Sequence, residues 1–419
     1  MAEVVRPSSG LDWACRLLFE SGRAVARRRG QAPPAGFERA EAYLALPRAA
    51  NPRLLVPLGS RQAAATALAR NHDATSTKAR LGRAALGTGL KVGLTQRVAD
   101  RVEVFVDPSL SPAERPEHVL TEHLRVMFGR SDLEMAVILG VPRLNRKPVL
   151  QVLAADGSVV GYVKAAWNDL TAALVRNETR VLSHLAATGP TTFTPPAFVA
   201  AGQWGDLELI AASALPNAAR PDQAQVFDPP MPVIAEIAGL WGRSAAKLAD
   251  SPYWAGLRER QHAQSGSDLL DRAIDWVEGR IGSTEIAFGA WHGDFTPWNM
   301  ARLGGGSRGP GEAGRTYVWD WERAAPAPAG LDLLHFVFQS VCRFEGKTPA
   351  DAVESSSDRV AALLPVLDVE PGTLGALWLL YRLELLLRYD EARMAGVLAR
   401  QSKIHEGLLE MFDRDLEDP

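Results

Sequence analysis

The sequence predicts an α+β protein with two lobes, a small antiparallel sheet followed by a mainly helical region. Residues 133–140, 147–154 and 159–167 are three short apolar stretches in succession, with the length and composition of strands. Two more strand-like stretches lie between residues 195 and 212, after one helical stretch. Beyond residue 230, apolar residues recur mostly at helical spacing. A sheet followed by packed helices is a recognised layer arrangement.

The first 128 residues predict a different arrangement of helices and strands. Apolar residues between 11 and 29 predict an amphipathic helix that ends in three arginines, where cations suit the helix dipole. Pro and Gly within 31–36 break it. The segment 37–128 then predicts a mixed α/β extension without a recognisable motif. Its strands are expected at 40–47, 53–59 and 100–108, and its helices at 60–71, capped by Ser60, and at 116–129, ending at Gly129.

Local sequence patterns predict where the hairpin of the sheet and the helices lie. An Ala-Asp-Gly turn at 155–157 predicts a hairpin, and a helix is expected over 169–187. Further helices are expected at 232–249, 267–281, 331–344 and 376–399. The predicted organisation is therefore an N-terminal helix and linker (1–36), the extension (37–128), a sheet lobe (129–212) and a helical lobe (213–419).

Composition excludes several function classes. The formal net charge is −3, so no broad basic field for nucleic acid is expected. The two cysteines, Cys15 and Cys342, cannot form a disulfide framework, which is typical of a reducing cytoplasm. No run of about 18 apolar residues occurs, so no membrane partner is predicted.

The stretch WHGDFTPWN at 291–299 contains the candidate catalytic residues. Asp294 and Asn299 form D-x-x-x-x-N, and the next strand presents Asp320 at its end. The Gly-rich segment 302–315 between them predicts a chain reversal that brings Asn299 and Asp320 to neighbouring strands. A carboxylate that orients and deprotonates a hydroxyl, beside hard oxygen ligands for Mg²⁺, suits phosphoryl transfer. Asp294 fits the first role; Asn299 and Asp320 fit the second.

These motifs resemble the aminoglycoside phosphotransferase and choline kinase family, the small-molecule branch of the protein-kinase-like bilobed fold. The resemblance covers residues 130–400. It implies that Lys164, on the third strand, holds the α- and β-phosphates and that Glu178, on the following helix, is its ion-pair partner. It also implies that the strand at 207–212, with Glu208 and Ile210, lies against the adenine.

The resemblance and the sequence also suggest roles for several other residues. In the turn 139–147, which the resemblance places over the phosphates, Gly140, Asn145 and Arg146 are candidates for phosphate contact. Asp332 is expected to be structural. His292 is expected to brace the catalytic loop, and Trp298 to pack it or line the acceptor site.

The resemblance implies an enzyme that uses ATP or GTP with Mg²⁺ and phosphorylates a hydroxyl of an aminoglycoside, sugar or amino alcohol. A cytoplasmic location is predicted from the cysteine content. One alternative is a kinase for Ser or Thr of a peptide in a natural-product assembly, with a peptide or protein partner docked by the N-terminal extension. A second alternative is a nucleotide-binding pseudokinase scaffold. Because Glu384 and Arg388 are four residues apart, we expect a surface ion pair, and the sequence does not establish an acidic acceptor pocket.

Overall fold

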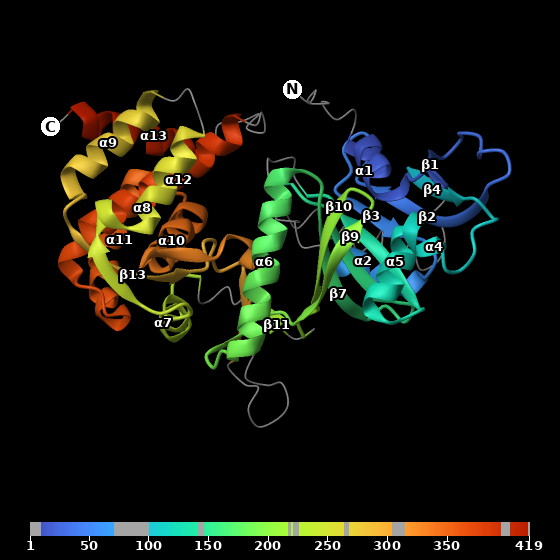
Figure 1. The fold of residues 1–419 in the computed structure, drawn as a ribbon, viewed down its shortest axis with the longest axis horizontal. Helices are drawn as coiled ribbons and strands as arrows, with labels where there is room; N and C mark the ends of the chain where they lie inside the picture. Colours follow the sequence, from blue (N-terminus) through green and yellow to red (C-terminus); the bar gives the residue numbers. More distant parts are fainter. Residues whose placement is uncertain are drawn as a thin grey trace. The chain divides into compact units, whose positions relative to one another are not determined.

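A computed structural model of the chain describes residues 10–70, 100–140, 146–216, 219–220, 226–263, 268–303, 315–394 and 403–417. The chain divides into two compact units. The first unit runs to Thr179 and includes Ala197–Leu215; the second comprises Arg180–Pro196 and the chain from Pro216 onward. The predicted α+β class is confirmed (Figure 1). Among the described residues, no helix is both long and apolar enough to cross a bilayer.

The first unit is built on one nine-stranded sheet, with the order β1-β4-β2-β3-β5-β6-β7-β10-β9. Every neighbouring pair is antiparallel. The strands are β1 (Ala24–Arg28), β2 (Glu38–Leu46), β3 (Leu54–Pro57), β4 (Arg101–Val106), β5 (Leu133–Ile138), β6 (Val149–Ala154), β7 (Val159–Ala166), β9 (Phe198–Trp204) and β10 (Leu207–Ser213).

The five strands predicted for the sheet lobe lie together as β5-β6-β7-β10-β9, and helix α6 (Asp169–Thr188) connects the third to the fourth along the chain. The sheet does not stop at five strands, however. Strand β3 pairs with β5 through Leu54–Ile138 and Leu55–Val137, so the 37–128 segment continues the same sheet. Alternation in a sequence shows which residues face inward, but it does not show which strand pairs with which.

The single helix predicted for residues 11–29 is wrong. Helix α1 covers Gly10–Phe19, and β1 follows at Ala24–Arg28, where it pairs with β4. The pairing supplies β1 with backbone hydrogen bonds, and it outweighs a helical pattern whose last arginines have no apolar face to bury. The arginines of this segment therefore lie in and beside an edge strand, where Arg28 pairs with Asp12.

Helices cover both faces of this sheet. Leu11, Leu18 and Phe19 of α1 pack on one face beside Leu120 and Leu124 of α5 (Leu120–Phe128). Helix α2 (Arg61–Arg70) packs its alanines and Leu68 on the other face. The predicted helix ends are confirmed: the Ser60 hydroxyl accepts from the Ala63 N–H at 3.2 Å, and Gly129 adopts φ 63° after α5.

The second unit contains two small sheets and most of the helices. Strands β11 (Ala219–Arg220), β14 (Met300–Leu303), β15 (Thr316–Val318) and β8 (Phe193–Thr194) form one sheet in that order. Strands β12 (Ser244–Lys247), β13 (Glu285–Trp291) and β16 (Ala325–Pro328) form the other. The helices are α7 (Met231–Ala238), α8 (Pro252–His262), α9 (Asp268–Ile281), α10 (Leu331–Ser340), α11 (Pro349–Leu363), α12 (Leu374–Met394) and α13 (Lys403–Glu417).

One predicted helix in this unit is too long. The stretch 232–249 continues as a helix only to Ala238, and residues 244–247 form β12 against β13 instead. Gly239 and Gly242 lie between the two elements, and Gly242 has φ 83°, a conformation that ends a right-handed helix.

Candidate active site

The loop between β13 and β14 holds the predicted catalytic motif, and most of it is buried. From Trp291 to Asn299, only Asp294 and Trp298 are partly exposed. Gly293 has φ 82°, and a Cβ there would lie 2.5 Å from the Arg323 carbonyl oxygen. Only glycine fits this close approach of two backbone segments. The chain thus turns sharply just before Asp294 and leaves that side chain at the surface of a rigid loop.

Asp332, in the first turn of α10, holds the loop through two hydrogen bonds. Its carboxylate accepts the backbone N–H of His292 at 2.6 Å and that of Gly293 at 3.2 Å. The residue is only 3% exposed. Burial raises the pKa of Asp332 to about 7, while the two N–H bonds act in the opposite direction. These contacts agree with the expected structural role, because they satisfy two buried donors that have no strand partner.

His292 connects the loop to the end of the neighbouring strand. It is fully buried; its Nδ1 lies 3.3 Å from the Asp294 N–H and its Nε2 lies 3.0 Å from the Trp319 carbonyl oxygen. Burial lowers the pKa of His292 to about 4, so the ring is neutral near pH 7. Since Nδ1 accepts, the proton lies on Nε2 and is donated to Trp319. His292 therefore has the bracing geometry that the sequence suggested.

The Asp294 carboxylate is held by one hydrogen bond on each oxygen. Asn299 Nδ2 donates to Oδ2 at 2.9 Å, and His335 Nε2 lies 3.1 Å from Oδ1. Burial acts to raise the pKa of Asp294, but the hydrogen bond from His335 and the nearby positive charge of Arg388 act in the opposite direction, and the net pKa is lowered. The side chain keeps 39% of its surface exposed. Asp294 is therefore an ionised, oriented carboxylate that is accessible from solvent.

His335 and Tyr381 were not found from the sequence. Tyr381, on α12, lies with its hydroxyl 3.0 Å from His335 Nδ1. Burial raises the pKa of Tyr381 well above its usual value and lowers the pKa of His335. The phenol is thus protonated and donates to a neutral imidazole, which leaves the Nε2 proton for Asp294. The only sequence signal was that His335 follows Asp332 by three residues on one helix.

Asn299 and Asp320 lie at the same end of the β14–β15 hairpin, as predicted. Met300 pairs with Val318, so Asn299 directly precedes one strand while Asp320 follows the other by two residues. The Trp319 N–H donates to the Asn299 carbonyl at 3.1 Å. Asn299 Nδ2 donates to the Asp294 backbone carbonyl at 2.8 Å and also to the Asp294 carboxylate. The side-chain oxygen of Asn299, Oδ1, therefore remains as an acceptor or metal ligand. An amide oxygen and a carboxylate are ligands that fit Mg²⁺.

Asp320 has an unusual backbone. Its φ of 71° and ψ of 51° place it in the left-handed region. Within the described chain, Asp320 and Asp368 are the only residues other than glycine with positive φ. Asp tolerates this conformation better than most residues do, and such strain is concentrated at functional sites.

Arg388, on α12, completes the support of the loop. Its Nη1 donates to the Gly293 carbonyl at 2.6 Å, and its guanidinium lies 4.6 Å from the Trp291 ring centre. Its Nε pairs with Glu384 at 2.8 Å, and Arg260 pairs with the same carboxylate. The predicted Glu384–Arg388 pair is confirmed, but its expected location at the surface is wrong, because the Glu384 side chain is only 3% exposed. A helical spacing of four predicts a pair, but it does not tell which side of the helix is covered.

In the first unit, Lys164 and Glu178 form the predicted ion pair, with 2.6 Å between Nζ and Oε2. Lys164 lies on β7 and Glu178 on α6, and both side chains are largely buried. Arg176, a competing partner on the same helix, pairs instead with Glu208 at 2.7 Å.

The remaining predicted nucleotide contacts are less well placed. At Glu208 and Ile210, β10 has a partner strand on each side, so their backbone groups are used within the sheet. Arg146 Nε donates to the Leu139 carbonyl, and its guanidinium lies over the Trp13 ring, so its contact with a phosphate stays a prediction. Gly140 follows the end of β5 by two residues and has φ 63°. Asn145 lies outside the described residues.

Comparison with solved structures finds similar chains among phosphotransferases. A point mutant of aminoglycoside 2'-phosphotransferase-IIIa in complex with GDP is 15% identical, with a TM-score of 0.45, over 71% of this chain and 98% of that one. Spectinomycin phosphotransferase APH(9)-Ia in complex with ADP and spectinomycin is 16% identical, with a TM-score of 0.39, over 72% of this chain and 94% of that one. A glucosamine kinase is also 16% identical, with a TM-score of 0.35, over 75% of this chain and 86% of that one. No family model and no curated protein matches the sequence. Similarity this distant carries no argument about activity, so function rests on the residues described above.

Proposed function

We propose that the chain is a phosphotransferase that moves the γ-phosphate of ATP or GTP to a hydroxyl of a small molecule, an aminoglycoside, sugar or amino alcohol. The observation that carries the proposal is the Asp294 carboxylate, ionised, partly exposed and hydrogen-bonded on both oxygens. A carboxylate fixed in this way can accept a hydrogen bond from an acceptor hydroxyl and take its proton as the phosphoryl group is transferred.

The other residues support the same chemistry. Asn299 Oδ1 and the Asp320 carboxylate would hold Mg²⁺, which neutralises charge on the nucleotide's phosphates when bound. Lys164, oriented by Glu178 at 2.6 Å, would contact the α- and β-phosphates. His335, Tyr381 and His292, all uncharged, would keep Asp294 and its loop in position through hydrogen bonds. Glu208 and Ile210 are left out of the proposal, because their backbone groups are paired within the sheet.

The proposal is tested with γ-labelled ATP and GTP, Mg²⁺ and a panel of hydroxyl acceptors, followed by phosphorus NMR of the products. The panel contains amino sugars, neutral sugars, amino alcohols and Ser- or Thr-containing peptides. We expect a phosphate ester on at least one small-molecule acceptor. Label found only on the peptides would replace this proposal with a peptide kinase. Thermal stabilisation by nucleotide without transfer to any acceptor would instead indicate a scaffold.

The metal role of Asp320 gives a separate prediction. Asp320→Asn retains a side chain that tolerates the left-handed conformation but removes the charge. We expect the Mg²⁺ concentration for half-maximal transfer to rise at least about tenfold, since even indirect metal contacts are worth that much. The measurement is a Mg²⁺ titration of transfer rate, with Asp358→Asn, an exposed carboxylate on α11, as the matched control. An unchanged Mg²⁺ requirement in Asp320→Asn would remove this residue from the metal site.

A further inference from the structure

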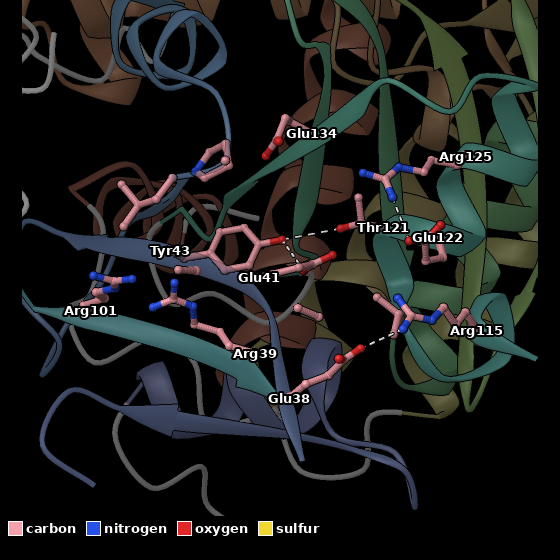
Figure 2. A pocket seen from close by; sticks show the side chains of 16 residues that line it. Glu38, Arg39, Glu41, Tyr43, Arg101, Arg115, Thr121, Glu122, Arg125 and Glu134 are labelled. Carbon is pink, nitrogen blue, oxygen red and sulfur yellow. Dashed lines mark hydrogen bonds and ion pairs between the residues drawn. The ribbon is translucent and has the colours of Figure 1, made fainter. Parts of the chain in front are cut away.

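The first unit contains a cavity of about 650 Å³ that no residue of the proposed phosphate-transfer site lines. Strand β2 forms one wall, and the segment from α4 (Arg115–His118) through α5 faces it. Figure 2 shows charged side chains from both walls directed into this space. Its volume lies in the range of small-molecule sites, although its lining is unusually rich in charge.

The four arginines that line the cavity each have a carboxylate partner. Arg115 pairs with Glu38 at 2.8 Å, and Arg125 pairs with Glu122 at 2.7 Å. Arg39 and Arg101 share Glu103, at 3.1 and 3.0 Å. Three carboxylates, Glu38, Glu122 and Glu103, thus pair with the four arginines, and Glu103 lies outside the lining.

Two carboxylates of the lining remain, Glu41 and Glu134. Among the residues that the structure describes, neither has a cationic side chain within ion-pair distance. Glu41 accepts a hydrogen bond of 2.7 Å from the Tyr43 hydroxyl. The formal charges of the lining balance, with four arginines and four glutamates, but Glu41 and Glu134 are the two carboxylates of the lining without an ion-pair partner among the described residues. Figure 2 labels both side chains.

Glu41 occupies a position that a core would normally fill with an apolar side chain. It pairs across the sheet with Val104, and both it and Tyr43 lie on the face that packs the core beneath α1 and α5. A bulge between Arg39 and Glu41 interrupts the pairing of β2 just before this point. Bulges often redirect a side chain beside a functional site.

Glu134 is held against a glycine. A Cβ at Gly59 would lie 2.2 Å from the Glu134 Oε1, so the absence of a side chain at Gly59 makes room for this carboxylate. Burial raises the pKa of Glu134, and the charge of Glu41 raises it further. Burial likewise raises the pKa of Glu41. A cation in the cavity would stabilise the charged form of both groups.

The lining also contains buried N–H groups that have no hydrogen-bond acceptor among the described residues. Arg101 and Arg125 each have a buried Nε–H without a hydrogen-bond acceptor within the described structure. A ligand that satisfies the cavity must therefore offer acceptor oxygens as well as a positive charge, because buried donors left unpaired are costly.

We propose that this cavity binds a small polar molecule that carries a protonated amine together with hydroxyl or carboxylate oxygens. The amine lies between Glu41 and Glu134, with the Tyr43 hydroxyl beside it, and the oxygens face Arg101 and Arg125. This is a binding site separate from the proposed phosphate-transfer site, and it does not depend on that activity.

The test is calorimetric titration of the full chain with glucosamine and with L-lysine, the two sources of this chemistry. Each is compared with its fully N-acetylated counterpart, N-acetylglucosamine or Nα,Nε-diacetyl-L-lysine, which has no ammonium charge. We expect at least one of the two amines to bind with a Kd of about 1 mM or below, and its acetylated form to bind at least tenfold more weakly. In Glu41→Gln and in Glu134→Gln the same amine should bind at least tenfold more weakly.

Two controls separate a binding role from a structural one. Glu38→Gln removes an exposed carboxylate at the rim, which already pairs with Arg115, and should change the affinity less than twofold. Glu41→Gln should melt no lower than the unmodified chain in the absence of ligand, because it removes a charge without a cationic partner. The proposal is overturned if neither amine binds, if the acetylated forms bind equally well, or if both cavity variants keep full affinity.

Discussion

Replacing Asp294 by Asn is expected to lower the rate of phosphate transfer by about 10²–10⁴-fold, the usual contribution of a positioned general base. The amide has nearly the same shape, but it cannot take a proton. It also has only one oxygen, whereas Asn299 and His335 both donate to the carboxylate. One of these donors would then face an NH₂ group. The substituted side chain should therefore lose its fixed orientation as well as its basicity.

The measurement is acceptor-dependent ADP release at saturating nucleotide, with nucleotide affinity determined in parallel. Affinity should be unchanged, because the proposed phosphate contact of Lys164 is not affected. Asp413→Asn, an exposed carboxylate on α13, serves as the matched control and should retain full rate. Equal turnover by Asp294→Asn and the unmodified chain would end the assignment of Asp294 as the base.

The largest effect on stability is expected for Asp332→Ala. The change leaves the N–H groups of His292 and Gly293 without an acceptor in a buried loop. An unsatisfied buried donor costs about 1–3 kcal/mol, so two of them should lower the free energy of unfolding by about 2–6 kcal/mol. Urea unfolding followed by tryptophan fluorescence will report the loss, since Trp291 directly precedes the loop.

Two variants accompany this measurement. Asp332→Asn keeps one acceptor oxygen and should fall between Asp332→Ala and the unmodified chain. Asp358→Ala, an exposed aspartate on α11, should change stability by less than about 0.5 kcal/mol. A urea midpoint for Asp332→Ala equal to that of Asp358→Ala would show that the loop does not need this carboxylate.

Much of the site could be predicted because its residues are close in sequence or lie at strand ends. Asp294 and Asn299 are five residues apart on one loop, and the hairpin that follows brings Asp320 beside Asn299. The pairing of Lys164 with Glu178 follows from a strand that leads into a helix. In each case local geometry determines which side chains meet.

Other features depend on contacts between distant segments. Tyr381 reaches His335 across 46 positions, and β3 joins β5 through pairings that no local pattern encodes. Spacing alone showed that Glu384 and Arg388 could pair, but only packing against α8 and the catalytic loop buries them. The amphipathic pattern of residues 11–29 was overridden in the same way, because β1 gains a partner strand.

We propose that Asn299 and Asp320 hold a divalent ion at the phosphates of a nucleotide, beside the Asp294 carboxylate. Crystals grown with Mn²⁺ and a non-hydrolysable ATP analogue test it through anomalous scattering from the metal. We expect a peak within coordination distance of both Asn299 Oδ1 and the Asp320 carboxylate, with the Asp294 carboxylate facing the γ-phosphate. A metal bound to the nucleotide but remote from Asn299 and Asp320 would contradict the account.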